Sequence, residues 1–402
     1  MNDPIKKVLL EKYAEKYKSI SSNKILFKIK HLLEISGYPN NMYDWVQIYN
    51  SLININHNID IINSVSYQNL SIKLIDTNYI EINNSESFLI PPKLSFFRNL
   101  KVLDIYNCPY ILNVSTNQYL QKLLIKDCYK LVTIDLNETI KDVVLINLPS
   151  LILPEYLFTN TDLNKLILNN IKSINILSNQ IYNNINLNGL SLINLSLKSL
   201  DLNIINLINL KYLELISLQD FRFNDIVFEL KNLIILKINY INIPNLPLRN
   251  NIINNNLKIL NLKHNNLTQL FPNIHILTNL QELNLEDNKL SYLPDNIGNL
   301  PNLTQLIIDK NNLISLPDSI GQLNNLKTLS VNDNNNLKSF PESLKLLSNL
   351  YTLEFLNTKI IKIPKLIYNM NLRKIGITLS KKQPKHIIVG NNKLFYENNY
   401  FL

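Results

Sequence analysis

A leucine pattern with a period of 20 to 24 residues runs through most of the chain, and it constrains the fold more than any other feature. Its clearest copies are residues 257–267 (LKILNLKHNNL), 280–290 (LQELNLEDNKL) and 303–313 (LTQLIIDKNNL). A fixed period of this length is typical of proteins built from stacked repeats. With the same template, units begin at Leu100, Leu120, Ile140, Leu163, Leu187, Leu210, Leu233, Leu257, Leu280, Leu303, Leu326, Leu350 and Leu372.

The leucines at positions one, four and six of each unit predict a short strand. Side chains alternate along a strand, so positions four and six share one face, and positions three, five and seven share the other. One such strand cannot bury its leucines alone, whereas parallel strands stacked one per unit form a continuous core. We therefore predict an α/β solenoid with a parallel sheet.

The return path of each unit is expected to be less regular than the strand. Proline has a fixed φ and no amide hydrogen, so we expect it to end regular structure after the turn. The apolar residues that follow should pack back toward the core. The prolines concerned are Pro294, Pro317, Pro341 and Pro364, and the apolar residues include Ile297, Leu300, Ile320 and Leu323.

These units resemble the leucine-rich repeat, whose pattern is L-x-x-L-x-L-x-x-N/C-x-L. The resemblance implies a horseshoe in which the parallel sheet lines the concave side. Residues 293–298 (LPDNIG) and 316–321 (LPDSIG) are similar to intracellular repeats of the Ras-pathway-scaffold and plant Ras-group type. That similarity implies a non-enzymatic scaffold in signalling, which binds a partner protein on its concave face.

The ninth position of a unit is expected to form a structural ladder. Asparagine carries both a donor and an acceptor, so it can satisfy backbone groups where the strand bends. The ladder residues are Asn265, Asn288, Asn311, Asn334, Cys108 and Cys128. For the two cysteines, a redox pair or half of a metal site is the alternative, although no CxxC or CxxH accompanies them. Middle units carry Leu148, Ile171, Leu195, Leu218 and Ile241 at this position, so we expect irregular coil there.

Four segments follow from the pattern. Residues 1–60 read as a helical N-terminal cap or adaptor, and residues 61–99 as a transition with a degenerate repeat. Residues 100–371 hold about 12 units, and residues 372–402 form a last degenerate unit with a basic C-terminal cap. If residues 1–60 were an adaptor, the alternative function would be a ubiquitin-ligase substrate receptor, although the Leu-Pro opening of that family is absent.

No catalytic constellation is found in the sequence. The six glycines are far apart, which excludes a phosphate-binding loop, and the histidines show no HExxH spacing. We expect no enzymatic activity, no cofactor and no metal. No apolar run approaches the length of a membrane span, and two cysteines in a chain without a signal peptide favour a cytoplasmic location, in the host if the protein is viral.

The overall composition says little about possible binding partners, whereas the positions of the charged residues along the chain say more. Asparagine is about one residue in six and Ala14 is the only alanine, which we interpret as the bias of an AT-rich genome. The net charge of +9 lies almost wholly in residues 359–402, so it is a weak indication of nucleic-acid binding. The acids of the regular units should instead form a concave field, which a monomer presents to a partner with a basic surface. The predicted contact residues are Glu282, Glu286, Asp287, Asp309, Asp333, Glu354 and His264.

Overall fold

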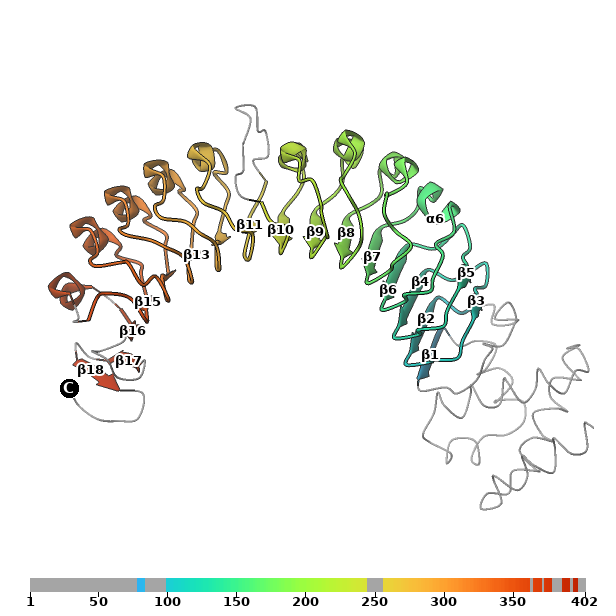
Figure 1. The fold of residues 1–402 in the computed structure, drawn as a ribbon, viewed down its shortest axis with the longest axis horizontal. Coiled ribbons are helices and arrows are strands. Elements are labelled where there is room, and N and C mark those ends of the chain that lie inside the picture. Colours follow the sequence, from blue (N-terminus) through green and yellow to red (C-terminus); the bar gives the residue numbers. More distant parts are fainter. Residues whose placement is uncertain are drawn as a thin grey trace, which may run out of the picture. The chain divides into compact units, whose positions relative to one another are not determined.

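The computed structural model describes residues 78–83, 99–243, 256–361, 364–370, 372–377, 385–390 and 393–396 (Figure 1). The chain divides into two compact units, Met1–Leu157 and Phe158–Leu402, and we describe each by itself. The expected helical cap at residues 1–60 lies outside the described residues. The horseshoe curvature stays a prediction.

The first unit is a stack of parallel strands. Their order is β1 (Tyr79–Asn83), β2 (Val102–Tyr106), β4 (Lys122–Lys126) and β6 (Asp142–Ile146). On the return path, β3 (Asn113–Ser115) and β5 (Thr133–Asp135) form a second parallel pair. Strand β1 lies within the segment that was expected to be a degenerate repeat, and it pairs with β2 in the same register as the later strands.

The second unit continues the pattern with one strand per repeat, and the predicted solenoid with a long parallel sheet is confirmed. The strands follow one another in sequence order in Figure 1. They are β7 (Lys165–Asn169), β8 (Gly189–Ile193), β9 (Tyr212–Ile216), β10 (Ile235–Asn239), β11 (Ile259–Asn261), β12 (Glu282–Asn284), β13 (Gln305–Ile307), β14 (Thr328–Ser330), β15 (Thr352–Phe355) and β16 (Lys374–Ile377). Strand β17 (Lys385–Gly390) then pairs antiparallel with β16, and β18 (Lys393–Tyr396) pairs antiparallel with β17.

The return paths contain 3-10 helices, and the described residues hold only one α-helix, α6 (Tyr156–Thr159). The 3-10 helices are η2 (Asn179–Asn183), η3 (Leu202–Asn206), η4 (Asp225–Glu229), η5 (Pro272–Ile276), η6 (Asp295–Asn299), η7 (Asp318–Gln322), η8 (Glu342–Leu346) and η9 (Lys365–Asn369). The expectation that the prolines end regular structure was wrong. Pro294, Pro317, Pro341 and Pro364 are the N-cap residues of η6 to η9, because their fixed φ leads the extended chain into the next turn.

The core lies behind the sheet, where the leucine pattern placed it. Leu283, Leu306 and Leu329 are at most 1% exposed and pair directly with one another through β12, β13 and β14. The side chains of Ile297 and Ile320 pack inward from the return path, as expected. Each turn thus buries one strand face and one helix face against its neighbours.

In the middle repeats, position nine lies in the irregular turn that follows each strand, as expected. The strands before that turn, β7 to β10, are five residues long, whereas β11 to β14 are three. The apolar side chains at position nine, such as Leu195 and Leu218, are buried at 3% exposure or less. A buried aliphatic side chain at this position therefore replaces asparagine without loss of the bend.

The packing of one return helix on the next leads to a testable stability effect. A Cβ atom added at Gly321, in η7, would lie 2.3 Å from the Ser343 carbonyl oxygen in η8. Gly321→Ala should therefore lower the free energy of unfolding by about 1–3 kcal/mol, since two backbones must move apart. Urea unfolding followed by circular dichroism measures this. Gly189→Ala is the matched control, because the nearest atom to its added Cβ is Lys165 Cγ at 3.6 Å, and an equal loss there would contradict the packing argument.

Candidate functional site

The candidate site is the open face of the second unit, which we define as the face of its sheet formed by positions three, five and seven, together with position eight at the rim. The six predicted acids lie on four consecutive turns of this face, from β12 to β15. Glu282 and Asp287 are exposed, and the other four are half-buried. The structure therefore brings the six side chains onto one surface but leaves them unequally accessible.

Two of the half-buried carboxylates are neutralised by lysines on the next turn. Glu286 Oε1 lies 3.0 Å from Lys310 Nζ, and Glu354 Oε1 lies 2.9 Å from Lys374 Nζ. In the sequence, Lys374 belongs to residues 359–402, which carry most of the net charge and follow the acidic units. Because it lies on β16, it instead extends that positive charge onto the open face.

Asp309 does not point freely to solvent, which corrects the sequence-based expectation. It accepts hydrogen bonds from Ser330 Oγ at 2.6 Å and from the backbone amide of Asn332 at 2.8 Å. Burial raises the pKa of this carboxyl, although the donors from Ser330 and Asn332 oppose the change. A lysine at this position would lose both bonds, so Asp309→Lys would alter the local structure as well as the charge.

His264 belongs to a cluster at the rim of the open face. Its Nδ1 lies 2.5 Å from Asp287 Oδ2 on the next turn. Its ring stacks on Tyr240 of the preceding turn, with 4.2 Å between ring centroids and 13° between the planes. Asp333 makes a similar contact across turns, since it accepts a hydrogen bond from Asn357 Nδ2 at 2.7 Å. These contacts hold the rim side chains in place before any partner arrives.

Position eight is a row of left-handed residues that the sequence reasoning missed. One residue per turn has φ between 51° and 59°, and its amide donates to a carbonyl of the next turn in most units, for example Asp287 to Asp309 at 2.9 Å. The usable signal was the frequency of Asn and Asp here, since these residues tolerate positive φ. The row comprises Asn107, Asp127, Asn147, Asn170, Asn194, Ser217, Tyr240, His264, Asp287, Lys310, Asp333 and Asn357.

The four asparagines at position nine are buried, and their side chains bond to backbone atoms of their own turn and of the preceding turn. Asn288 is representative. Its Nδ2 donates to the carbonyls of Leu262, Leu285 and Glu286, at 3.0, 2.9 and 3.3 Å. Its Oδ1 accepts the amides of Asn265 and Leu267 at 3.2 and 2.9 Å. These side chains face the interior, so they support the open face and do not belong to it.

A second asparagine row lies at the outside, directly before the first leucine of most units. Asn302 Nδ2, for example, donates to the carbonyl of Thr278 on the preceding turn at 2.9 Å. The same bond is made by Asn186, Asn209, Asn232, Asn256, Asn325 and Asn349. Much of the asparagine content therefore has a structural use, beyond any bias of the genome.

Cys108 and Cys128, in the first unit, are buried and are not joined by a disulfide. Each thiol donates to the carbonyl two residues upstream, Tyr106 at 3.0 Å and Lys126 at 3.4 Å. The hydrogen bond with the Cys108 side chain, together with burial, raises the pKa of the Cys128 thiol. A thiol kept protonated in this way is a poor nucleophile and a poor metal ligand.

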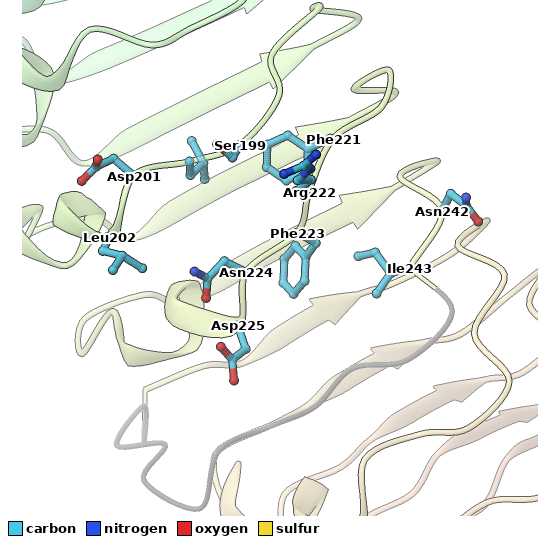
Figure 2. A pocket seen from close by; sticks show the side chains of 11 residues that line it. Ser199, Asp201, Leu202, Phe221, Arg222, Phe223, Asn224, Asp225, Asn242 and Ile243 are labelled. Carbon is cyan, nitrogen blue, oxygen red and sulfur yellow. The ribbon is translucent and has the colours of Figure 1, made fainter.

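Figure 2 shows a pocket of about 600 Å³ at the side of the middle turns, away from the open face. Asp201 and Asn224 line it, but their side chains already accept the amides of Asn203 and Ile226 as caps of η3 and η4. Its aromatic wall is formed by Phe221 and Phe223. Because its polar groups maintain local structure, we do not treat this pocket as the candidate site.

Metal sites and membrane-spanning helices can be assessed in the part of the chain that the structure describes. No group of three or more histidine, cysteine or carboxylate side chains is arranged to hold a metal ion there. Among the helices of the same residues, none combines the length and the apolar character needed to cross a membrane.

Comparison with known proteins supports the interpretation that the chain contains leucine-rich repeats. Residues 250–388 match the sequence model of a family described as a leucine-rich repeat region. These repeats of the second unit are therefore similar to leucine-rich repeats. No curated protein matches the chain significantly in sequence.

Several solved structures are similar to the chain. A leucine-rich repeat protein of Leptospira interrogans is 24% identical, covers 76% of this chain and 98% of its own, and gives a TM-score of 0.49. An internalin of Listeria monocytogenes is 16% identical, with 80% and 86% coverage and a TM-score of 0.46. The repeat ectodomain of a plant membrane receptor kinase from Arabidopsis thaliana is 16% identical, with 77% and 49% coverage and a TM-score of 0.42.

Proposed function

We propose that this protein is a non-enzymatic scaffold that binds another protein through the open face of its second unit, the face expected to be concave. Leucine-rich repeats are generally protein-interaction modules. The observation that carries the proposal is the contiguous open face, whose side chains are held by contacts between turns. A surface organised before binding loses little side-chain entropy when a partner docks.

The partner is proposed to be basic where it meets β12. Glu282 is exposed at position three, and the Asp287 side chain is 52% exposed beside His264. Glu286 and Glu354 are already paired with lysines, so they contribute less to attraction. Electrostatic complementarity of this kind raises the association rate and weakens with salt.

A charge reversal tests this site. Glu282→Lys should weaken binding of the partner about tenfold at low salt, because it replaces an attraction by a repulsion at an exposed position. The partner is first captured by placing a photo-cross-linking residue at position 282 of the full chain, and its affinity is then measured with purified proteins.

The matched control for this test is Glu342→Lys. It makes the same charge change on η8, where the Glu342 side chain is 82% exposed on the return path. Equal binding by Glu282→Lys and the unmodified chain would exclude the acidic site. Equal weakening by both variants would show a nonspecific charge effect.

Other features of the proposal have separate support. The LPDNIG and LPDSIG segments favour an intracellular signalling scaffold of the Ras-pathway type, and the absence of any catalytic motif favours a non-enzyme. A cytoplasmic, monomeric protein that does not bind nucleic acid stays a prediction. The ubiquitin-ligase alternative depends on residues 1–60, which lie outside the described residues, and the family match to residues 250–388 lends it no support.

A further inference from the structure

The left-handed row contains one tyrosine, a residue type that does not favour this backbone. Most positions in the row are occupied by Asn or Asp, which accept positive φ at low cost. Tyr240, with φ of 59°, is a bulky exception, and burial compensates for its backbone only in part because the residue is 52% exposed. Strained residues that persist in this way are concentrated at binding sites.

The orientation of the Tyr240 ring follows from its stack on His264. The rings are nearly parallel, and their centroids are separated by 4.2 Å, close to the spacing of neighbouring strands of about 4.8 Å. The ring normal therefore runs along the direction in which the turns succeed one another. Since His264 covers one face of the ring, the other face is turned toward Ser217 on the preceding turn.

Ser217 stands beside that second face, and its small side chain predicts a slot there. Ser217 lies between Tyr240 and Asn194 in the row, because β9 pairs with β10 through Ile216 and Asn239, and with β8 through Ile193 and Ile216. Two turns separate Tyr240 from Asn194, a distance of roughly 9.6 Å, and only a hydroxymethyl group stands between them. A planar side chain inserted there would continue the existing stack.

Among the residues that the structure describes beside the slot, apolar side chains and paired charges are found. At position seven, the half-buried side chains of Ile193 and Ile216 provide an apolar floor. The nearest carboxylate on the sheet, Glu214, lies 3.5 Å from Lys237 Nζ, which also donates to the Tyr212 hydroxyl at 3.2 Å. An uncharged planar group thus complements this slot better than a cation does.

We propose that the slot between Tyr240 and Asn194, floored by Ile193 and Ile216, binds an aromatic side chain of the partner protein. Tyr240 then has the role of a specificity residue, because an aromatic pair gains stacking energy that an aliphatic side chain does not. The inference rests on the proposed function in that a partner docks on the open face. The proposed contact at Tyr240 is distinct from the contact at Glu282, which lies two turns further along the sheet.

Small amides test the slot without any protein partner, so the result is independent of the charge-reversal experiment. The full chain is titrated with N-acetyl-tryptophanamide, N-acetyl-leucinamide and N-acetyl-argininamide, and binding is followed by saturation-transfer NMR. We expect the tryptophan amide to bind most tightly. Tyr240→Asn should weaken it about three- to tenfold, the loss of one aromatic stack, without lowering the urea midpoint, since Asn suits the left-handed backbone.

Two variants complete the design. Ser217→His should abolish binding of the tryptophan amide, because the new ring repeats the His264 stack on the open face of Tyr240 and fills the slot. Tyr292→Asn is the matched control, since Tyr292 is 51% exposed but lies outside the row. The proposal is overturned if the tryptophan amide does not bind, if Tyr240→Asn and Ser217→His leave its binding unchanged, or if the arginine amide binds more tightly.

Discussion

Replacing Asn288 by alanine is expected to lower the free energy of unfolding by about 3–5 kcal/mol, the largest effect we predict for a single substitution. The side chain is 7% exposed and satisfies three carbonyls and two amides of the backbone. Each carbonyl keeps a second donor, from Asn265, Asn311 or the His264 amide. Alanine would, however, leave the amides of Asn265 and Leu267 buried without this acceptor, and each such group costs about 1–3 kcal/mol. Urea unfolding monitored by circular dichroism measures the loss.

Two comparisons isolate the cause of that loss. Asn302→Ala removes one exposed hydrogen bond of the outer row, so it should cost no more than about 1 kcal/mol. Asn288→Leu fills the volume without supplying donors or acceptors, and it should be nearly as destabilising as alanine. A near-neutral Asn288→Leu would contradict the ladder argument and show that this turn can adopt the geometry of the middle repeats, where leucine stands at position nine.

Leu306→Ala is expected to cost about 2–5 kcal/mol, because it opens a cavity between two buried neighbours. Leu306 is fully buried and pairs with Leu283 on one side and Leu329 on the other. Ile307→Ala, one residue later, is the control. Its side chain lies on the open face and is half-buried, so the loss should stay below about 1 kcal/mol.

The same unfolding measurement decides whether the register is correct. Because side chains alternate along a strand, a shift of one residue would exchange the two faces. Similar losses for Leu306→Ala and Ile307→Ala, or a larger loss for the second, would show that the open face has been assigned to the wrong side of the sheet.

The sequence predicted which residues lie on the open face, but it did not predict which of their charges are paired. Strand alternation was enough to place Glu282, Glu286 and Glu354 on one side of the sheet. It did not reveal that Lys310 neutralises Glu286 or that Lys374 neutralises Glu354, because these pairs are 24 and 20 residues apart in sequence. Their contact depends on the spacing of the turns and on side-chain rotamers.

In the return path and at the bend, too, some features were predicted from the sequence and others were not. The burial of Ile297 and Ile320 followed from hydrophobic pattern, whereas the role of Pro294 as the N-cap residue of η6 did not. The bend at position eight could have been found from its Asn and Asp residues. We overlooked it because the leucine-rich repeat pattern leaves that position unspecified.

The sequence by itself determined the period, the parallel strands, the buried leucines and the asparagine ladder, because each follows from local alternation and from the bonding capacity of one residue type. Tertiary structure alone decided which polar side chains remain accessible. Asp309 is engaged by Ser330 and Asn332 from the next turn, while Tyr240 stays exposed on a left-handed backbone beside His264. Accessibility on this surface is set by contacts between turns, and such contacts join residues that the repeat pattern treats as independent.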